Sequence, residues 1–130
     1  MKTVNQILDG KNTGIITVSP NDTVQDALEI MAEKRISSFP VIEKGNVVGI
    51  ISERDYIRKA VPKRVAPWDI TVREIMSEKV IYVSPEDPID ECMRLMTTNH
   101  FRHLPVKNGD DLVGMLSISD VLKALKGANA

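Results

Sequence analysis

Apolar residues recur along the chain in two patterns that alternate with one another. Short apolar runs at 15–18 and 80–83 lead into Ser-Pro, and this predicts two strands. Apolar residues then recur at i, i+3, i+4 and i+7 within 24–31 and within 89–96, which predicts an amphipathic helix in both places. The same order of elements therefore begins twice.

Each predicted helix is preceded by residues that suit a helix start. Asp22 and Asp87 stand at the expected N-cap positions, where a side-chain oxygen accepts a hydrogen bond from a free backbone N–H. Pro88 is expected at the first position of the second helix, because its missing N–H costs nothing there.

A predicted hairpin and a second helix follow. Strands are expected at 39–43 and 47–51, on either side of a polar turn that contains Gly45, and a helix is expected at 52–60. The same three elements are expected later in the chain, at 104–107, 112–116 and 117–125. The predicted order is β-α-β-β-α, and it occurs twice.

The repetition is also visible residue by residue. Residues 15–60 match residues 80–125 at 12 of 46 positions without a gap. A second echo precedes each copy, since residues 3–8 resemble residues 71–76. Two copies are too few for a solenoid, so we expect a tandem pair that packs face to face with pseudo-twofold symmetry.

The expected fold class is therefore α/β (α+β), with two similar repeats in one module. We expect a first repeat with an N-terminal helix at 1–62, a linker at 63–70 and a second repeat at 71–130. Pro67 and Trp68 lie in this linker, and proline ends regular structure.

Composition narrows the class of protein. The chain has 130 residues, of which 42% are hydrophobic and 27% charged, as in globular domains. The net charge of −1 argues against nucleic acid as a partner held by bulk charge. Cys92 stands alone, so neither a disulfide framework nor a zinc site is expected. Since no apolar run approaches the roughly 20 residues of a membrane helix, we expect a cytoplasmic protein without a membrane partner.

Two short segments carry a resemblance to a known family. Residues 49–55 read Gly-Ile-Ile-Ser-Glu-Arg-Asp, and residues 114–120 read Gly-Met-Leu-Ser-Ile-Ser-Asp. Both resemble the Gly-apolar-apolar-Ser/Thr-x-x-Asp signature of CBS domains, and residues 18–20, 40–41 and 100–106 fit the same family. From about residue 4 to residue 125 the chain thus resembles a pair of CBS domains, an arrangement called a Bateman module.

The resemblance implies a non-catalytic regulatory sensor. CBS pairs bind adenosine-containing ligands such as AMP, ADP, ATP or NAD, and sometimes S-adenosylmethionine, in clefts between the two copies. They report the presence of the ligand to a partner, and stand-alone pairs of this size commonly form disc-like homodimers. We therefore expect an adenine nucleotide as regulatory ligand, no metal, a homodimer and an unidentified regulated protein.

The signature places a serine and an aspartate at the start of each second helix. Ser52 with Asp55, and Ser117 with Asp120, have this spacing. The family uses the aspartate to bind ribose, and an ionised carboxylate can accept two hydrogen bonds from vicinal hydroxyls. The same spacing also fits a capping box, in which serine caps the helix. The two interpretations are compatible.

Basic residues near the signature are candidate phosphate contacts. Arg54 precedes the first aspartate, whereas Ser119 takes that place in the second repeat, so the two sites should differ in phosphate preference. Arg102 stands with His100 and His103 before Pro105. For these three, phosphate contact and surface packing remain open, and a metal role is disfavoured because no carboxylate has ligand spacing.

The family builds its adenine slot from the first strand and the residues just before the proline. In this sequence the corresponding residues are Thr17, Ser38, Phe39 and Pro40 in the first repeat, and Tyr82, His103, Leu104 and Pro105 in the second. Tyr82 could stack on a base or fill the slot itself, so binding in both clefts stays open.

Nothing in the sequence indicates catalysis. No paired catalytic carboxylates, P-loop or Gly-x-Gly-x-x-Gly motif occurs. The stripe of Met31, Cys92, Met93 and Met96 is expected to be core. The alternative function is a structural or protein-interaction module with empty clefts, which would use the basic stretch 54–64 and an exposed Trp68.

Overall fold

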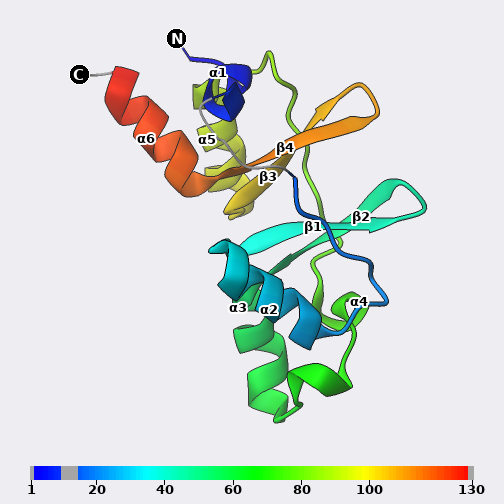
Figure 1. Ribbon diagram of the computed structural model, residues 1–130. Helices are drawn as coiled ribbons and strands as arrows, with labels where there is room; N and C mark the ends of the chain where they lie inside the picture. The colour runs from blue at the N-terminus through cyan, green and yellow to red at the C-terminus, as the bar shows by residue number, and fades with distance from the viewer. Residues whose placement is uncertain (1, 10–14, 129–130) are drawn as a thin grey trace. The chain divides into compact units, whose positions relative to one another are not determined.

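The fold consists of two hairpins with helices packed around each, among the residues that the structure describes (Figure 1). The structure is a computed structural model that describes residues 2–9 and 15–128. The earlier elements are α1 (Val4–Asp9), α2 (Val24–Lys34), β1 (Ser38–Glu43), β2 (Asn46–Ser52), α3 (Glu53–Asp55), the π turn η1 (Tyr56–Ala60), the 3₁₀ turns η2 (Val61–Lys63) and η3 (Pro67–Asp69), and α4 (Val72–Ile75). The later elements are α5 (Ile89–Asn99), β3 (His103–Asn108), β4 (Asp111–Ser117) and α6 (Ile118–Ala128).

The two long amphipathic helices and the two hairpins confirm the predicted pattern. In each hairpin the strands run antiparallel, and the register shifts once, after Val41 in the first and after Val106 in the second. The identical place of this irregularity shows that the sequence repeat is also a structural repeat. The first hairpin turns at Lys44 and Gly45, which both have positive φ, as tight two-residue turns between antiparallel strands require.

The strands predicted at 15–18 and 80–83 are wrong in length. Each run makes only one parallel bridge, Val18 with Val41 and Val83 with Val106. Val18 N–H donates to the Pro40 carbonyl at 3.2 Å, and its own carbonyl accepts from Ile42 at 2.8 Å. The pairing then stops, because the Ser-Pro that follows turns the chain and proline has no N–H to extend the ladder.

The predicted N-caps are also wrong. Thr23 caps α2, since its side chain accepts from Asp26 N–H, and Pro88 holds the cap position of α5 rather than the first helical position. The carboxylates of Asp22 and Asp87 instead accept from Ser19 N–H at 2.9 Å and Ser84 N–H at 2.8 Å. They close the Ser-Pro-x-Asp turn, which occupies the chain just before each helix.

The second helix differs between the repeats. Residues 118–128 form one regular helix, α6. The helix predicted at 52–60 is α3 for three residues and then widens into the π turn η1. Pro62 ends it, because proline lacks the N–H that a helix interior needs.

The described chain forms two compact units that do not coincide with the sequence repeats. One unit holds residues 16–80, and the other joins the N-terminal residues up to 15 to the residues from 81 onward. The segment α1, expected with the first repeat, thus packs with the second, and α4 packs with the first. The segment α1 directly precedes the first repeat but packs on the second, and α4 directly precedes the second repeat but packs on the first.

Backbone hydrogen bonds hold both segments in the same way. Val4 N–H donates to the Asp87 carbonyl at 2.9 Å, and Val72 N–H donates to the Asp22 carbonyl at 2.8 Å. Each valine is fully buried. We call α1 and α4 the exchanged arms.

Each unit has its own hydrophobic core. The core of residues 16–80 comprises Val18, Val24, Ala27, Met31, Phe39, Val41, Ile51, Val72, Ile75 and Met76. The other core comprises Val4, Val83, Ile89, Cys92, Met96, Leu104, Val106, Leu116, Val121 and Ala124, with Met93 packed against it. The expectation that the methionine and cysteine stripe is core is confirmed.

Candidate functional site

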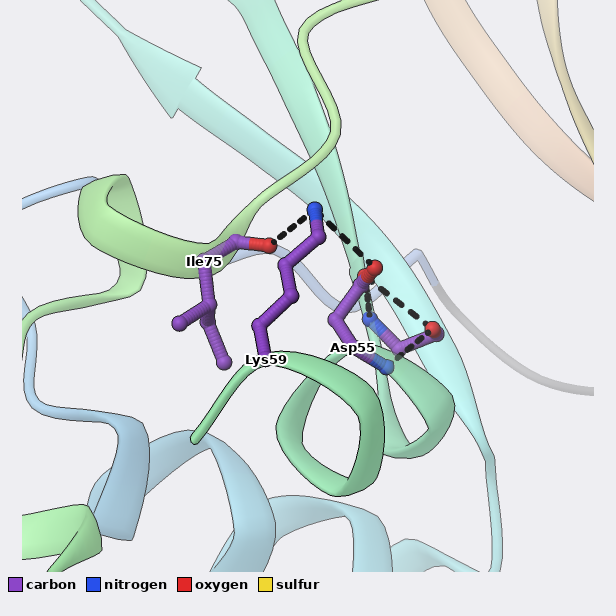
Figure 2. A network of polar contacts seen from close by, with 4 residues as sticks. Asp55, Lys59 and Ile75 are labelled. Atoms are coloured by element: carbon purple, nitrogen blue, oxygen red, sulfur yellow. Dashed lines mark hydrogen bonds and ion pairs between the residues drawn. The ribbon is translucent and has the colours of Figure 1, made fainter. Parts of the chain in front are cut away.

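The turn from β2 into α3 is a complete capping box. Ser52 N–H and Ser52 Oγ both donate to Asp55 Oδ2, at 2.9 and 3.0 Å, and Asp55 N–H donates to Ser52 Oγ at 3.2 Å (Figure 2). These bonds satisfy two backbone donors at the helix start. They also fix the direction of the carboxylate, which is only partly buried. The carboxylate thus has a fixed direction and keeps part of its exposure.

The second repeat reproduces this turn. Ser117 N–H donates to Asp120 Oδ2 at 2.9 Å, and Asp120 N–H donates to Ser117 Oγ at 3.1 Å. The capping interpretation of the Ser-x-x-Asp spacing is therefore confirmed in both repeats. The cap uses Oδ2 of each carboxylate, and the binding of ribose by these carboxylates stays a prediction.

The start of each hairpin lies beside this turn. Ser38 is the register partner of Ser52, and His103 is the register partner of Ser117. The first N–H of each helix also donates back across the hairpin, from Glu53 to the Ser37 carbonyl at 2.9 Å. The structure thus brings the predicted site residues before the proline together with the Ser-x-x-Asp turn inside each unit.

Ser38 carries an unsatisfied hydroxyl. The residue is 8% exposed, and its Oγ has no hydrogen-bond partner among the described residues. A buried polar group without a partner costs about 1–3 kcal/mol. A ligand that bonds to this hydroxyl would remove that cost, so the assignment of Ser38 to the binding site stays a prediction.

The remaining predicted residues of the slot divide by burial. Phe39, Pro40, Leu104 and Pro105 are buried, and Phe39 and Leu104 belong to the hydrophobic cores of their units. Thr17 is exposed and directly precedes the bridge residue Val18. It therefore lies at the edge of β1.

Tyr82 has a neighbour that the sequence did not predict. The Lys107 ammonium lies 4.1 Å from the centre of the Tyr82 ring, which is within the range of a cation–π contact. This contact occupies one face of the ring, and a role of Tyr82 in stacking on a base stays a prediction.

The predicted phosphate contacts lie at the surface. Arg54, Arg102, Ser119 and His100 are all exposed, and His103 is half-buried at the start of β3. The Arg102 carbonyl accepts from Ile118 N–H at 2.8 Å, which places residue 102 beside the start of α6. Their assignment as ligand contacts stays a prediction.

Lys59, which the sequence did not indicate as a site residue, contacts the capping box of the first repeat. Its Nζ donates to the Ile75 carbonyl at 2.9 Å and lies 3.5 Å from Asp55 Oδ1. Figure 2 shows the ammonium between the carboxylate and the end of α4. The i,i+4 spacing of Asp55 and Lys59 in a helix was the available signal. The contact with Ile75 had none, because it depends on the packing of an exchanged arm.

Cys92 is unsuited to act as a nucleophile. The residue is fully buried in the core. Desolvation, followed by the nearby carboxylates of Asp87, Glu91 and Asp90, raises the pKa of its thiol to about 11. The reactive thiolate is therefore scarce at neutral pH.

The described part of the chain lacks two features. No group of three or more histidine, cysteine, aspartate or glutamate side chains there is arranged to hold a metal ion. Among the same residues, no helix combines the length and the apolar character needed to cross a membrane.

Comparison with known proteins agrees with this arrangement. The family model of the CBS domain matches residues 6–61 and 72–127. A curated relative, the mitochondrial CBS domain-containing protein CBSX3 of Arabidopsis thaliana, is 38% identical over 110 residues. That alignment covers 81% of this chain but 53% of the relative, so the chain spans about half of that protein.

Solved structures share the whole fold. A protein with CBS domains from Burkholderia ambifaria MC40-6 has a TM-score of 0.92 and 44% identity, over 97% of this chain and 95% of that one. The CBS domain pair of protein MJ0100, in complex with 5′-methylthioadenosine and S-adenosyl-L-methionine, has a TM-score of 0.84 and 26% identity, over 98% of both chains. The chain therefore belongs to the CBS domain family and is a CBS-pair regulatory module.

Proposed function

We propose that this CBS pair is a non-catalytic sensor that binds an adenosine-containing ligand, namely AMP, ADP, ATP or NAD, and signals its presence to a partner protein. The observation that carries the proposal is the doubled Ser-x-x-Asp turn. In each repeat the cap fixes the direction of a partly buried carboxylate. A carboxylate oriented in advance loses little entropy when it accepts hydrogen bonds from ribose hydroxyls.

The surroundings of the turn support an adenosine ligand. Ser38 Oγ, which has no hydrogen-bond partner among the described residues, lies on the register partner of Ser52 and could bond to a ligand. Arg54 in the first repeat and Arg102 in the second are the proposed phosphate contacts, because guanidinium binds phosphate through two parallel bonds. The MJ0100 pair, which holds two adenosyl compounds, supports the same ligand class.

Signalling requires that the ligand bind one conformation of the module more tightly than another.

We propose that the module works as a homodimer. Ile57 and Leu122, which occupy equivalent positions in the two repeats, are 55% and 47% exposed in the single chain. Apolar residues exposed at matching places are suited to contact a second copy. Light scattering coupled to gel filtration would test the dimer, and the cytoplasmic location stays a prediction.

The proposal is tested by ligand binding to wild type and to the double variant Asp55→Ala, Asp120→Ala. Thermal unfolding with AMP, ADP, ATP, NAD, NADH and S-adenosylmethionine identifies the ligand, and calorimetry gives its affinity. A ligand at 100 times its Kd stabilises a protein by about 2.7 kcal/mol per site. We expect this stabilisation in wild type and its loss in the double variant.

The matched control is Asp22→Ala with Asp87→Ala. Asp22 and Asp87 each accept from the N–H of a serine three residues earlier, as Asp55 and Asp120 do. They lie outside the proposed site. The control should lose stability and keep its affinity. Unchanged affinity in the Asp55 and Asp120 variant would refute the ribose role of the two carboxylates.

A second candidate function is an interaction module without a ligand. Its supporting observation is Trp68, which is 66% exposed on η3, since tryptophan often anchors protein interfaces. A wild-type protein that binds none of the nucleotides would favour this function. The decisive measurement would then be whether a Trp68→Ala variant loses binding to an identified partner.

A further inference from the structure

We propose that Lys59 makes the first repeat selective for phosphorylated adenosine ligands over uncharged ones. This inference rests on the proposed function, because it assigns a role to a residue that touches the ribose-binding carboxylate. Lys59 acts through Asp55 and through its own charge, so it is a positioning and selectivity residue of that site.

The contacts of Lys59 hold its ammonium in one place. Nζ donates to the Ile75 carbonyl at the end of α4 and lies 3.5 Å from Asp55 Oδ1 (Figure 2). The Lys59 side chain is 45% exposed, whereas the Asp55 side chain is 17% exposed. The charge is thus anchored by the exchanged arm and still faces solvent beside the carboxylate.

The position of the Lys59 ammonium reduces an electrostatic repulsion in the proposed site. An ionised Asp55 that binds the ribose hydroxyls also repels the 5′-phosphate of the same nucleotide, because that phosphate is only a few ångströms from the ribose. An ammonium beside the carboxylate offsets its charge and attracts the phosphate. Uncharged adenosine meets no such repulsion, so it gains nothing from Lys59.

The second repeat lacks this charge at the equivalent position. Ala124 stands there, and its methyl group is buried in the core of its unit. The arm α1 is held on that unit as α4 is held on the first, but no lysine at this position reaches it. The cation is therefore a feature of the first repeat and not of the shared architecture.

The test compares AMP with adenosine by calorimetry. All proteins carry Asp120→Asn, so that binding at the second carboxylate is weakened. Lys59→Gln removes the charge but keeps a donor for the Ile75 carbonyl, and we expect the ratio of AMP affinity to adenosine affinity to fall about three- to fivefold, as for a partly exposed charge pair. Lys59→Arg restores the charge and should restore the ratio.

The control is Lys63→Gln, which changes the net charge equally at an exposed position eight residues beyond Asp55. It should leave the ratio near the wild-type value. A merely structural role of Lys59 would weaken both ligands equally, and that result would overturn the inference while the proposed function stands. Failure of wild-type protein to bind any nucleotide of the panel would overturn the proposed function and the inference together.

Discussion

At the scale of single residues, two equivalent glycines show how closely the exchanged arms are packed. A Cβ added to Gly49 would lie 2.8 Å from both the Met76 sulfur and the Ser77 carbonyl oxygen. A Cβ added to Gly114 would lie 2.7 Å from a methyl group of Leu8. The glycine of the CBS signature thus permits the close approach of a segment from elsewhere in the sequence, α1 at Gly114 and the residues just after α4 at Gly49.

We predict that Gly49→Ala destabilises the protein more than Gly114→Ala. At Gly49 the new methyl group meets backbone, which cannot move without breaking the bond between Ser77 N–H and the Ile50 carbonyl. At Gly114 it meets the end of a flexible leucine. Overpacking costs roughly 1–3 kcal/mol, and we expect Gly49→Ala at the upper end. Urea denaturation of both variants checks this, and equal losses would contradict it.

At this scale a short distance along the chain was necessary for a correct prediction but not sufficient. The Ser52 and Asp55 capping box was predictable because its partners are three residues apart. The caps of α2 and α5 were missed, since Asp22 and Asp87 were already engaged in the Ser-Pro turn. Lys59 was missed because its strongest contact is with Ile75, sixteen residues away.

At the scale of elements, the first hairpin is joined by a turn that its sequence suits only partly. Lys44 has φ 52° and Gly45 has φ 81°. Glycine adopts such angles freely, whereas a side chain such as lysine is strained there. Asparagine tolerates this region best among the residues with a side chain, and Asn-Gly is the preferred pair in such turns.

We therefore predict that Lys44→Asn stabilises the protein, by about 0.5–1 kcal/mol. Gly45→Ala in the same turn should destabilise it. A Cβ at Gly45 would meet nothing within 4 Å, so any loss there comes from backbone strain alone. Thermal unfolding measures both changes, and a Lys44→Asn variant with a lower midpoint would contradict the account.

The element-scale predictions followed the strength of the local pattern. Helices α2 and α5 were predicted because an amphipathic period continues for three turns. The strands at 15–18 and 80–83 were overpredicted, since an apolar run shows that a segment is buried but not how many of its residues find a pairing edge. Only Val18 and Val83 find one.

At the scale of the whole molecule, the exchange of arms decides which residues stabilise each unit. Val4 and Val72 occupy equivalent places in α1 and α4, and both are fully buried. Val4 belongs to the core of α5, β3, β4 and α6, and Val72 belongs to the core of α2, β1 and β2. A unit therefore depends on a segment that is distant in sequence.

We predict that Val4→Ala and Val72→Ala destabilise different units. Each removes buried methyl groups at a cost of about 2 kcal/mol. Hydrogen exchange should become faster within residues 81–128 for Val4→Ala, and within residues 16–80 for Val72→Ala. If Val4→Ala instead made hydrogen exchange faster within residues 16–80, α1 would belong to the repeat that directly follows it. That result would refute the exchange of arms.

The sequence by itself determined the family, the repeat and the position of the Ser-x-x-Asp turns, because each depends on residues that are neighbours or share a short period. Only the tertiary structure decided that α1 and α4 change places, that Ser38 keeps an unpaired hydroxyl, and that Lys59 reaches Ile75. These features depend on which segments meet. Residues 3–8 and 71–76 are similar in sequence, so each segment could pack on either repeat. Only the contacts between distant segments decided which repeat each one packs on.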